Sequence, residues 1–245
     1  MRMYLKNKSL PLLLGITMGA ASLFSHAAGL QISPTSLSLP AKQRAGIFTL
    51  SNTGKEPLTA QVRVFRWEQD EKGENILTPS TAVIASPPMV KLSAGGVQQF
   101  RIIRTQPAGS AEEAYRLVVD ELPAPEKKPK NGLQFVLRYS VPLFLNQTEN
   151  PETQLQWQIQ SAKNGKALLT VQNVGFAHAQ LSNITFQTAI EKNKLSLVNG
   201  LAGYVLPGKK WQTTLDVSPS ALRKGTLSVT VNGQQTLPEV RFAGN

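Results

Sequence analysis

The stretch LQFVLRYSVPLFL, from Leu133 to Leu145, carries an apolar side chain at every second position. A period of two is typical of a β-strand with one apolar face. At about 3.3 Å per residue the stretch would reach roughly 43 Å, whereas the common strand has only about 5–6 residues. We therefore predict a strand that is longer than one small sandwich needs, with a surplus apolar face that contacts another protein.

Shorter segments of the same kind lie before and after this strand, separated by turn residues. Short strands at regular spacing favour an immunoglobulin-like sandwich. The predicted strands are Gly29–Leu39 with a break at Pro34, Ala45–Leu50, Leu58–Trp67, Ala82–Ile84, Val97–Thr105 and Ala114–Leu122, and later Leu155–Ile159, Ala167–Val171, Ala179–Phe186, Leu195–Val198, Trp211–Val217, Thr226–Val231 and Val240–Phe242.

Two domains explain this pattern better than one large barrel. The segment FTLSNTG (Phe48–Gly54) is echoed by LTVQNVG (Leu169–Gly175), and each is an apolar strand that ends in an Asn-x-Gly turn. The predicted fold class is all-β, with two immunoglobulin-like sandwiches in tandem after a cleaved signal peptide. We place the N-terminal domain at residues 28–146, a polar linker at 147–153 and the C-terminal domain at 154–245.

Residues 1–27 have the pattern of a secretory signal peptide. Basic residues precede an apolar run, and Ser25-His26-Ala27 offers small residues at the two positions that a signal peptidase reads. The run is shorter than the ~20 apolar residues of a membrane-spanning helix. We therefore expect an exported protein that is not embedded in a membrane. The chain has no cysteine, so disulfides and thiolate metal sites are excluded.

The net charge is strongly positive. It is +11 for the whole chain, and about +8 remains when Arg2, Lys6 and Lys8 leave with the signal peptide. Nucleic acid is a poor partner for an exported protein, and no motif for binding RNA or DNA is present. We interpret the charge as a source of solubility, with a few basic side chains reserved for a specific carboxylate.

Catalysis finds little support in the sequence. His178 is the only histidine after the signal segment, and the motifs of serine hydrolases, zinc peptidases and phosphate-binding loops are absent. Asp120 and Glu121 are neighbours on a predicted strand, so they point to opposite faces. We predict no enzyme activity, no cofactor and no metal site. An exported hydrolase that uses His178 is the least favoured alternative.

These features together resemble the periplasmic chaperones of chaperone–usher pilus assembly. The resemblance covers essentially the whole predicted mature chain. It rests on the cysteine-free tandem sandwiches, on Ala85-Ser86-Pro87-Pro88, on Glu121-Leu122-Pro123, on the polar loop PAPEKKPKNG and on the long strand after it. In that family the chaperone lends its long strand to a pilin subunit that lacks its own last strand. The resemblance implies a periplasmic location and two partners, pilin or fimbrial subunits and an outer-membrane usher.

By position, the donor residues of this family match Leu133, Phe135 and Leu137, and Tyr139 extends the set. Each such side chain would contribute about 1.5–3 kcal/mol if it were fully buried in the subunit. Three alternatives stay open. These residues could pack inside their own domain, the free chaperone could self-associate through the strand, or the chain could be a structural or adhesive protein that lends no strand.

The sequence departs from the best-known branch of the family at the site for the subunit's terminal carboxylate. Where that branch has an arginine and a lysine, this chain has Ser36 and Pro142, which makes it more similar to the archaic or alternate branch. We nominate Arg116 as the first replacement anchor, because a basic residue in an apolar strand costs free energy unless it is paired. Arg138 and Lys130 are the second and third candidates. Two arginines of another predicted strand, Arg101 and Arg104, could equally serve.

Overall fold

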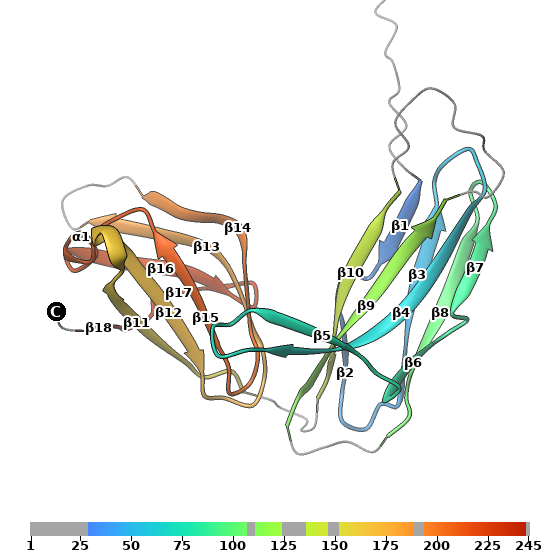
Figure 1. Ribbon diagram of the computed structural model, residues 1–245, viewed down its shortest axis with the longest axis horizontal. Helices are drawn as coiled ribbons and strands as arrows, with labels where there is room; N and C mark the ends of the chain where they lie inside the picture. Colours follow the sequence, from blue (N-terminus) through green and yellow to red (C-terminus); the bar gives the residue numbers. More distant parts are fainter. Residues whose placement is uncertain (1–28, 107–110, 124–135, 147–151, 189–193, 244–245) are drawn as a thin grey trace, which may run out of the picture.

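The computed structural model describes residues 29–106, 111–123, 136–146, 152–188 and 194–243. Its strands form four sheets. The first two sheets contain strands between Leu30 and Leu145, and the other two contain strands between Leu155 and Phe242. Figure 1 shows them as two sandwiches set at an angle to each other. The predicted all-β class with two sandwiches is confirmed, whereas the predicted signal peptide lies outside the described residues and the domain boundaries stay predictions.

The N-terminal sandwich packs a sheet of order β1-β3-β8-β6 against a sheet of order β2-β10-β9-β4-β5, with β7 paired to β4. Its strands are β1 (Leu30–Ser33), β2 (Leu37–Leu39), β3 (Ala45–Asn52), β4 (Leu58–Gln69), β5 (Asn75–Pro79), β6 (Val83–Ser86), β7 (Met89–Leu92), β8 (Val97–Arg104), β9 (Glu113–Leu122) and β10 (Arg138–Leu145). As predicted, the first segment breaks at Pro34, and its two halves join different sheets.

The C-terminal sandwich has sheets of order β15-β12-β11-β18 and β14-β13-β16-β17. Its elements are β11 (Leu155–Ser161), the 3-10 turn η1 (Lys163–Gly165), β12 (Ala167–Asn173), β13 (Ala179–Thr188), β14 (Leu195–Val205), β15 (Lys210–Leu215), α1 (Pro219–Leu222), β16 (Gly225–Val231), β17 (Gln234–Thr236) and β18 (Val240–Phe242). In the described part of the chain, no helix is long and apolar enough to cross a membrane.

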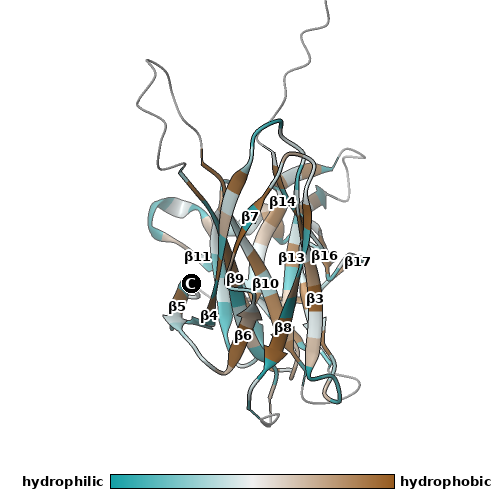
Figure 2. Cartoon of the chain, turned by 90° about the vertical axis from the view of Figure 1, so that its right-hand side faces the viewer, coloured by the Kyte–Doolittle hydropathy of each residue, from teal (hydrophilic) through white to brown (hydrophobic). Residues whose placement is uncertain are grey.

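Each sandwich has its own apolar core, built from the inward positions of alternating strands. In the N-terminal core Phe48 and Phe100 stack with ring centroids 5.1 Å apart, and the C-terminal core includes Trp157 and Ile159. Figure 2 shows the alternation as successive hydrophobic and hydrophilic bands along the strands. Separate cores mean that each sandwich buries its own apolar faces.

The internal echo in the sequence corresponds to one structural device used twice. Asn52 is buried, donates its side-chain amide to the carbonyls of Glu56 and Ser93, and accepts the N–H of Gly54 at 3.0 Å. Asn173 is buried in the same way. It donates to the carbonyls of Ala177 and Val205 and accepts the N–H of Gly175 at 3.0 Å. The Asn-x-Gly segment thus ties a strand end to neighbouring loops in both domains.

Candidate functional site

Strand β10 has one fully paired edge and one partly open edge. It pairs antiparallel with β9 along its whole length of eight residues. On the other side it pairs in parallel with β2, and only over residues 143–145. Within the described part of the chain, residues 138–142 therefore have no strand beside them on this edge. Unpaired backbone groups of this kind are a template for another chain.

The backbone groups at the open edge belong to even-numbered residues. The N–H of Glu121 donates to the carbonyl of Leu137, and hydrogen-bonded pairs alternate along an antiparallel ladder, so the odd residues of β10 bond to β9. The N–H and C=O groups of Arg138 and Ser140 therefore point to the open edge. Pro142 has no N–H, so an added strand would meet its last backbone donor at Ser140.

Within the described residues β10 begins at Arg138, so Val136 and Leu137 of the predicted strand Leu133–Leu145 lie before it. The partner strand β9 ends before Pro123, which has no N–H to continue the ladder. At this end the Glu121 carboxylate, rather than a backbone carbonyl, accepts the N–H of Leu137 at 3.3 Å. Residues 133–135 lie outside the described residues, so the surplus length of the strand stays a prediction.

Two of the four predicted donor residues, Leu133 and Phe135, lie outside the described residues. Leu137 and Tyr139 are half-buried and pack against the N-terminal core. The Tyr139 hydroxyl also donates to the carbonyl of Leu30 at 2.6 Å. The part of the donor face that the structure describes thus continues the domain's own core up to the open edge.

A groove runs beside this edge, between β1 and β10. Its volume is about 340 Å³. It is lined by Gln31, Ile32, Thr35, Tyr139, Ser140 and Val141. An apolar side chain that entered the groove would extend the N-terminal core rather than meet water.

Arg116 lies on the outer face of the same sheet. Its partner on β10 is Pro142 and its partner on β4 is Phe65. The structure therefore places Arg116 on the strand next to Pro142 and at the same height in the sheet, one strand spacing of about 4.8 Å away.

The guanidinium of Arg116 contacts aromatic rings instead of an acidic group. Its Cζ lies 3.6 Å from the ring centroid of Trp67 and 5.3 Å from that of Tyr204. Burial lowers the pKa of Arg116, and the nearby Tyr204 only partly opposes this effect. Among the described residues, no carboxylate lies within ion-pair distance of it. A half-buried cation without an acidic partner is suited to bind an incoming carboxylate.

The other anchor candidates are placed less favourably. Arg138 is exposed and pairs with Asp120, which Arg63 contacts at 2.7 Å. Burial would raise the pKa of Asp120, but hydrogen bonds from Arg138 and Arg63 outweigh it and keep that pKa below its ordinary value. Lys130 lies outside the described residues. On β8, in the opposite sheet, Arg101 is exposed and Arg104 is buried beside residue 146.

The two domains meet beneath this surface. An interdomain cluster is formed by Trp67, Ala114, Phe144 and Leu206, with Tyr204 packed against it. The side chain of Gln69 accepts the N–H of Leu206 at 2.9 Å and donates to the carbonyl of Tyr204 at 2.8 Å. A side chain of β4 thus bonds to the C-terminal sandwich as a neighbouring strand would.

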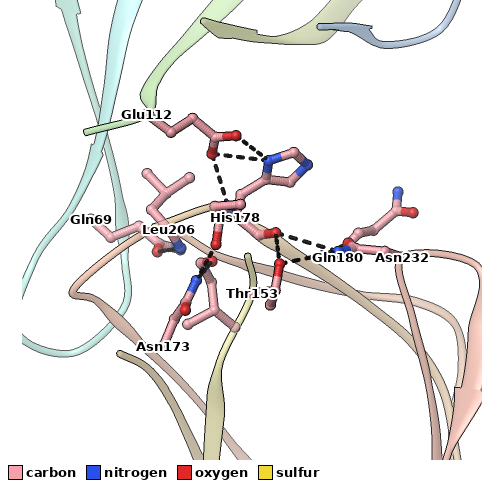
Figure 3. Close-up of polar contacts among 10 residues, drawn as sticks. Gln69, Glu112, Thr153, Asn173, His178, Gln180, Leu206 and Asn232 are labelled. Atoms are coloured by element: carbon pink, nitrogen blue, oxygen red, sulfur yellow. Dashed lines mark hydrogen bonds and ion pairs between the residues drawn. The ribbon is translucent and has the colours of Figure 1, made fainter. Parts of the chain in front are cut away.

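A second link joins the residue before β9 to the loop before β13. Both carboxylate oxygens of Glu112 lie 3.0 Å from Nδ1 of His178, and one of them accepts the His178 backbone N–H (Figure 3). The His178 ring also stacks on Phe144 with centroids 3.4 Å apart. Sequence reasoning expected His178 on the surface or half-buried, and no local signal indicated a link between domains. In the described residues, no group of three or more histidine, aspartate or glutamate side chains could hold a metal ion.

Comparisons with known proteins show the family and the fold. Residues 29–149 match the family model of the pili and flagellar-assembly chaperone, PapD N-terminal domain. A comparison with curated protein sequences gives no match. Among solved structures, the chain is similar to the chaperone in the CsuC–CsuE chaperone–tip adhesion subunit complex from archaic Csu pili of Acinetobacter baumannii. The identity is 27%, the TM-score is 0.66, and the match covers 89% of this chain and 100% of the other.

Two more distant matches show the fold alone. The Escherichia coli chaperone DraB is 17% identical with a TM-score of 0.61, over 87% of this chain and 97% of its own. A structure of Salmonella enterica SafA pilin with the SafB chaperone matches at 16% identity and a TM-score of 0.57, over 88% of this chain and 95% of the matched chain. With the family model on its N-terminal domain and the two-sandwich fold throughout, the chain belongs to the PapD-like pilus-assembly chaperones and resembles their archaic branch.

Proposed function

We propose that the protein is a periplasmic chaperone that captures pilin or fimbrial subunits by donor-strand complementation and delivers them to an outer-membrane usher. The observation that carries this proposal is the open edge of β10 at residues 138–142, beside a groove that leads to the N-terminal core. A subunit that lacks one strand gains both backbone pairing and apolar side chains at such an edge. Related structures hold a chaperone with a pilin or a tip subunit, which supports the class of partner.

The geometry also suggests the direction of the bound subunit strand. Strand β2 runs parallel to β10 and takes the edge from Leu143 onward. A subunit strand added in the same direction would end near Pro142, the residue of β10 that pairs with Arg116. Hydrogen bonds between charged groups contribute about 1.5–3 kcal/mol. We propose Arg116 as the anchor of the subunit's terminal carboxylate, ahead of Arg138 and Lys130.

The remaining parts of the proposal follow from the sequence and the family. The first 27 residues would direct export and be removed, which would place the mature chain in the periplasm. The work would be binding and folding, without catalysis or cofactor. The alternative is an exported structural or adhesive protein of two sandwiches that lends no strand.

The test compares two glutamate substitutions in the segment before β10. Phe135→Glu places a charge on the predicted donor face and should abolish capture of pilin subunits in periplasmic extract. Val136→Glu is the matched control, because Val136 has the opposite parity and is 51% exposed. It should capture subunits as the unmodified chaperone does. Val136→Glu should keep the thermal unfolding midpoint, because its side chain is exposed. The same measurement on Phe135→Glu distinguishes a loss of capture from a loss of folding.

Normal capture by Phe135→Glu would contradict the assignment of the donor face. If no small β-rich subunit copurified even with the unmodified chaperone, while the cognate pilus was being made, the adhesive or structural alternative would replace the proposal.

A further inference from the structure

The guanidinium of Arg116 contacts two rings that come from different domains. Trp67 belongs to β4 of the N-terminal sandwich, is 1% exposed, and its indole N–H donates to the side chain of Asn75 at 2.8 Å. Tyr204 belongs to β14 of the C-terminal sandwich and meets Trp67 edge-on, with ring centroids 5.3 Å apart. The guanidinium lies over both rings. Its position therefore depends on how the two sandwiches are docked.

The Tyr204 ring is fixed from both sides of the domain interface. Within its own domain, Gln180 donates its side-chain amide to the Tyr204 hydroxyl at 2.8 Å. From the N-terminal domain, Gln69 bonds to the backbone of Tyr204 and Leu206. A ring held at both its hydroxyl and its backbone has little freedom to follow a moving arginine, so it restricts where the guanidinium can lie.

Aromatic contacts hold an arginine without consuming its hydrogen bonds. The attraction acts between the cation and the ring face, so the N–H groups at the rim of the guanidinium plane stay available. An acidic neighbour would hold the side chain equally well, but it would compete with an incoming carboxylate. Contacts with rings from two domains fix the position of the guanidinium and leave its charge unpaired. A guanidinium held in this way can bind a carboxylate through two parallel hydrogen bonds.

We propose that Tyr204 is a positioning residue for Arg116, so that affinity for a subunit's terminal carboxylate depends on docking of the C-terminal domain. This inference rests on the proposed role of Arg116 as the anchor. Tyr204 acts through the guanidinium and does not itself need to touch the subunit. The C-terminal sandwich would then contribute to subunit binding even though the open edge belongs to the N-terminal one.

The experiment uses the mature two-domain protein and a synthetic peptide of alternating valine and threonine, prepared with a free terminal carboxylate and with a terminal amide. Calorimetry gives the ratio of the two affinities, which isolates the carboxylate from the backbone pairing. We expect the unmodified protein to prefer the acid about tenfold, which corresponds to about 1.4 kcal/mol. Arg116→Gln should bring the ratio to about one.

Two variants of Tyr204 then distinguish a positioning role of its ring from a purely structural role. Tyr204→Phe keeps the ring and should keep the ratio at about tenfold. Tyr204→Leu removes the ring and should reduce the ratio to about threefold or less, while the affinity for the amide peptide stays unchanged. Such a selective loss is not expected from a purely structural role.

Two results would overturn the inference, and they are distinguishable from each other. If Arg116→Gln kept the tenfold preference, the anchor itself would be wrong, and the role of Tyr204 would fall with it. If Arg116→Gln abolished the preference but Tyr204→Leu kept it, or weakened acid and amide peptides equally, Arg116 would remain the anchor and Tyr204 would not position it.

Discussion

The two sandwiches close in the same way but leave different edges open. In each domain the last strand pairs in parallel over three residues with a strand from the start of the domain, β10 with β2 in the N-terminal domain and β18 with β11 in the C-terminal domain. In β11 the paired residues, Trp157–Ile159, lie in the middle of the strand. In β10 they lie at one end, so five residues in a row keep an open edge.

The two domains differ in how much of a strand edge is paired with another strand. A closed first-to-last pairing completes a sandwich, whereas a pairing that covers one end of a strand leaves the other end as a receptor. The open end also carries features that discourage unspecific association. Arg138 is charged and exposed, and Pro142 interrupts the row of donors. The edge thus favours a strand whose side chains fit the groove and disfavours non-specific strand pairing.

One feature that the two domains share, the buried asparagine of the Asn-x-Gly segment, can be tested by substitution. Asn52→Ala and Asn173→Ala each remove one side chain that makes at least three hydrogen bonds and leave buried carbonyls without their donor. We expect each change to lower the free energy of unfolding of its own domain by about 3 kcal/mol. Hydrogen exchange resolved by domain measures the effect.

Aspartate at the same positions serves as a second variant. It keeps an oxygen that accepts the glycine N–H, but it replaces the amide donor with a second acceptor that faces the buried carbonyls. The aspartate variants should therefore also lower the free energy of unfolding, and by similar amounts in the two domains. A large loss at Asn52 with none at Asn173 would show that the echoed motif is structural in one domain only.

The feature in which the two domains differ, the open edge of β10, can be tested with a proline. Ser140→Pro removes the last backbone donor of that edge and places a ring where an added strand would lie. Capture of a subunit should fall about tenfold or more, while stability changes little because proline is tolerated on edge strands. The measurement is the dissociation constant of the chaperone–subunit complex.

Ser140→Ala keeps the backbone N–H and is the matched control, for which unchanged affinity is expected. An unchanged affinity in the proline variant as well would mean that subunits do not pair with residues 138–142, and the functional difference between β10 and β11 would disappear.

Alternation in the sequence predicted most strands that have one face in a core, and it missed β5 and β7. The residues of β5 are all exposed, so no period of two marks them, whereas β7 places only Val90 and Leu92 against the core, in a four-residue strand that directly follows Pro88. Arg116 is conspicuous in the sequence because a cation in an apolar strand is locally unusual, and its role as the anchor stays a prediction. Its ring contacts were not predictable, because Tyr204 reaches it from another domain and no local pattern records that approach. The donor residues Leu133 and Phe135 and the anchor candidate Lys130 stay predictions from sequence.

The smallest expected effect concerns the ion pairs of the two domains. In the N-terminal domain, the Asp120 side chain is 11% exposed and bonds to Arg63 and Arg138. In the C-terminal domain, Lys166 pairs with Asp216, whose side chain is 91% exposed. Because an exposed pair is screened by water, we expect Asp216→Asn to leave the free energy of unfolding unchanged and Asp120→Asn to lower it by up to about 1 kcal/mol at neutral pH.

The loss of unfolding free energy expected for Asp120→Asn should depend on pH in one direction. Hydrogen bonds from the two arginines keep the pKa of folded Asp120 below its ordinary value despite burial. The stabilisation is therefore present above the unfolded pKa of about 3.9 and is lost as the pH falls through the folded pKa. Urea unfolding at about pH 6 and about pH 3 should show the difference between Asp120→Asn and the unmodified protein shrinking towards zero in acid. A difference that persisted unchanged at the lower pH would mean that the asparagine variant loses packing around β9, and that the two arginines do not account for the stability of this face.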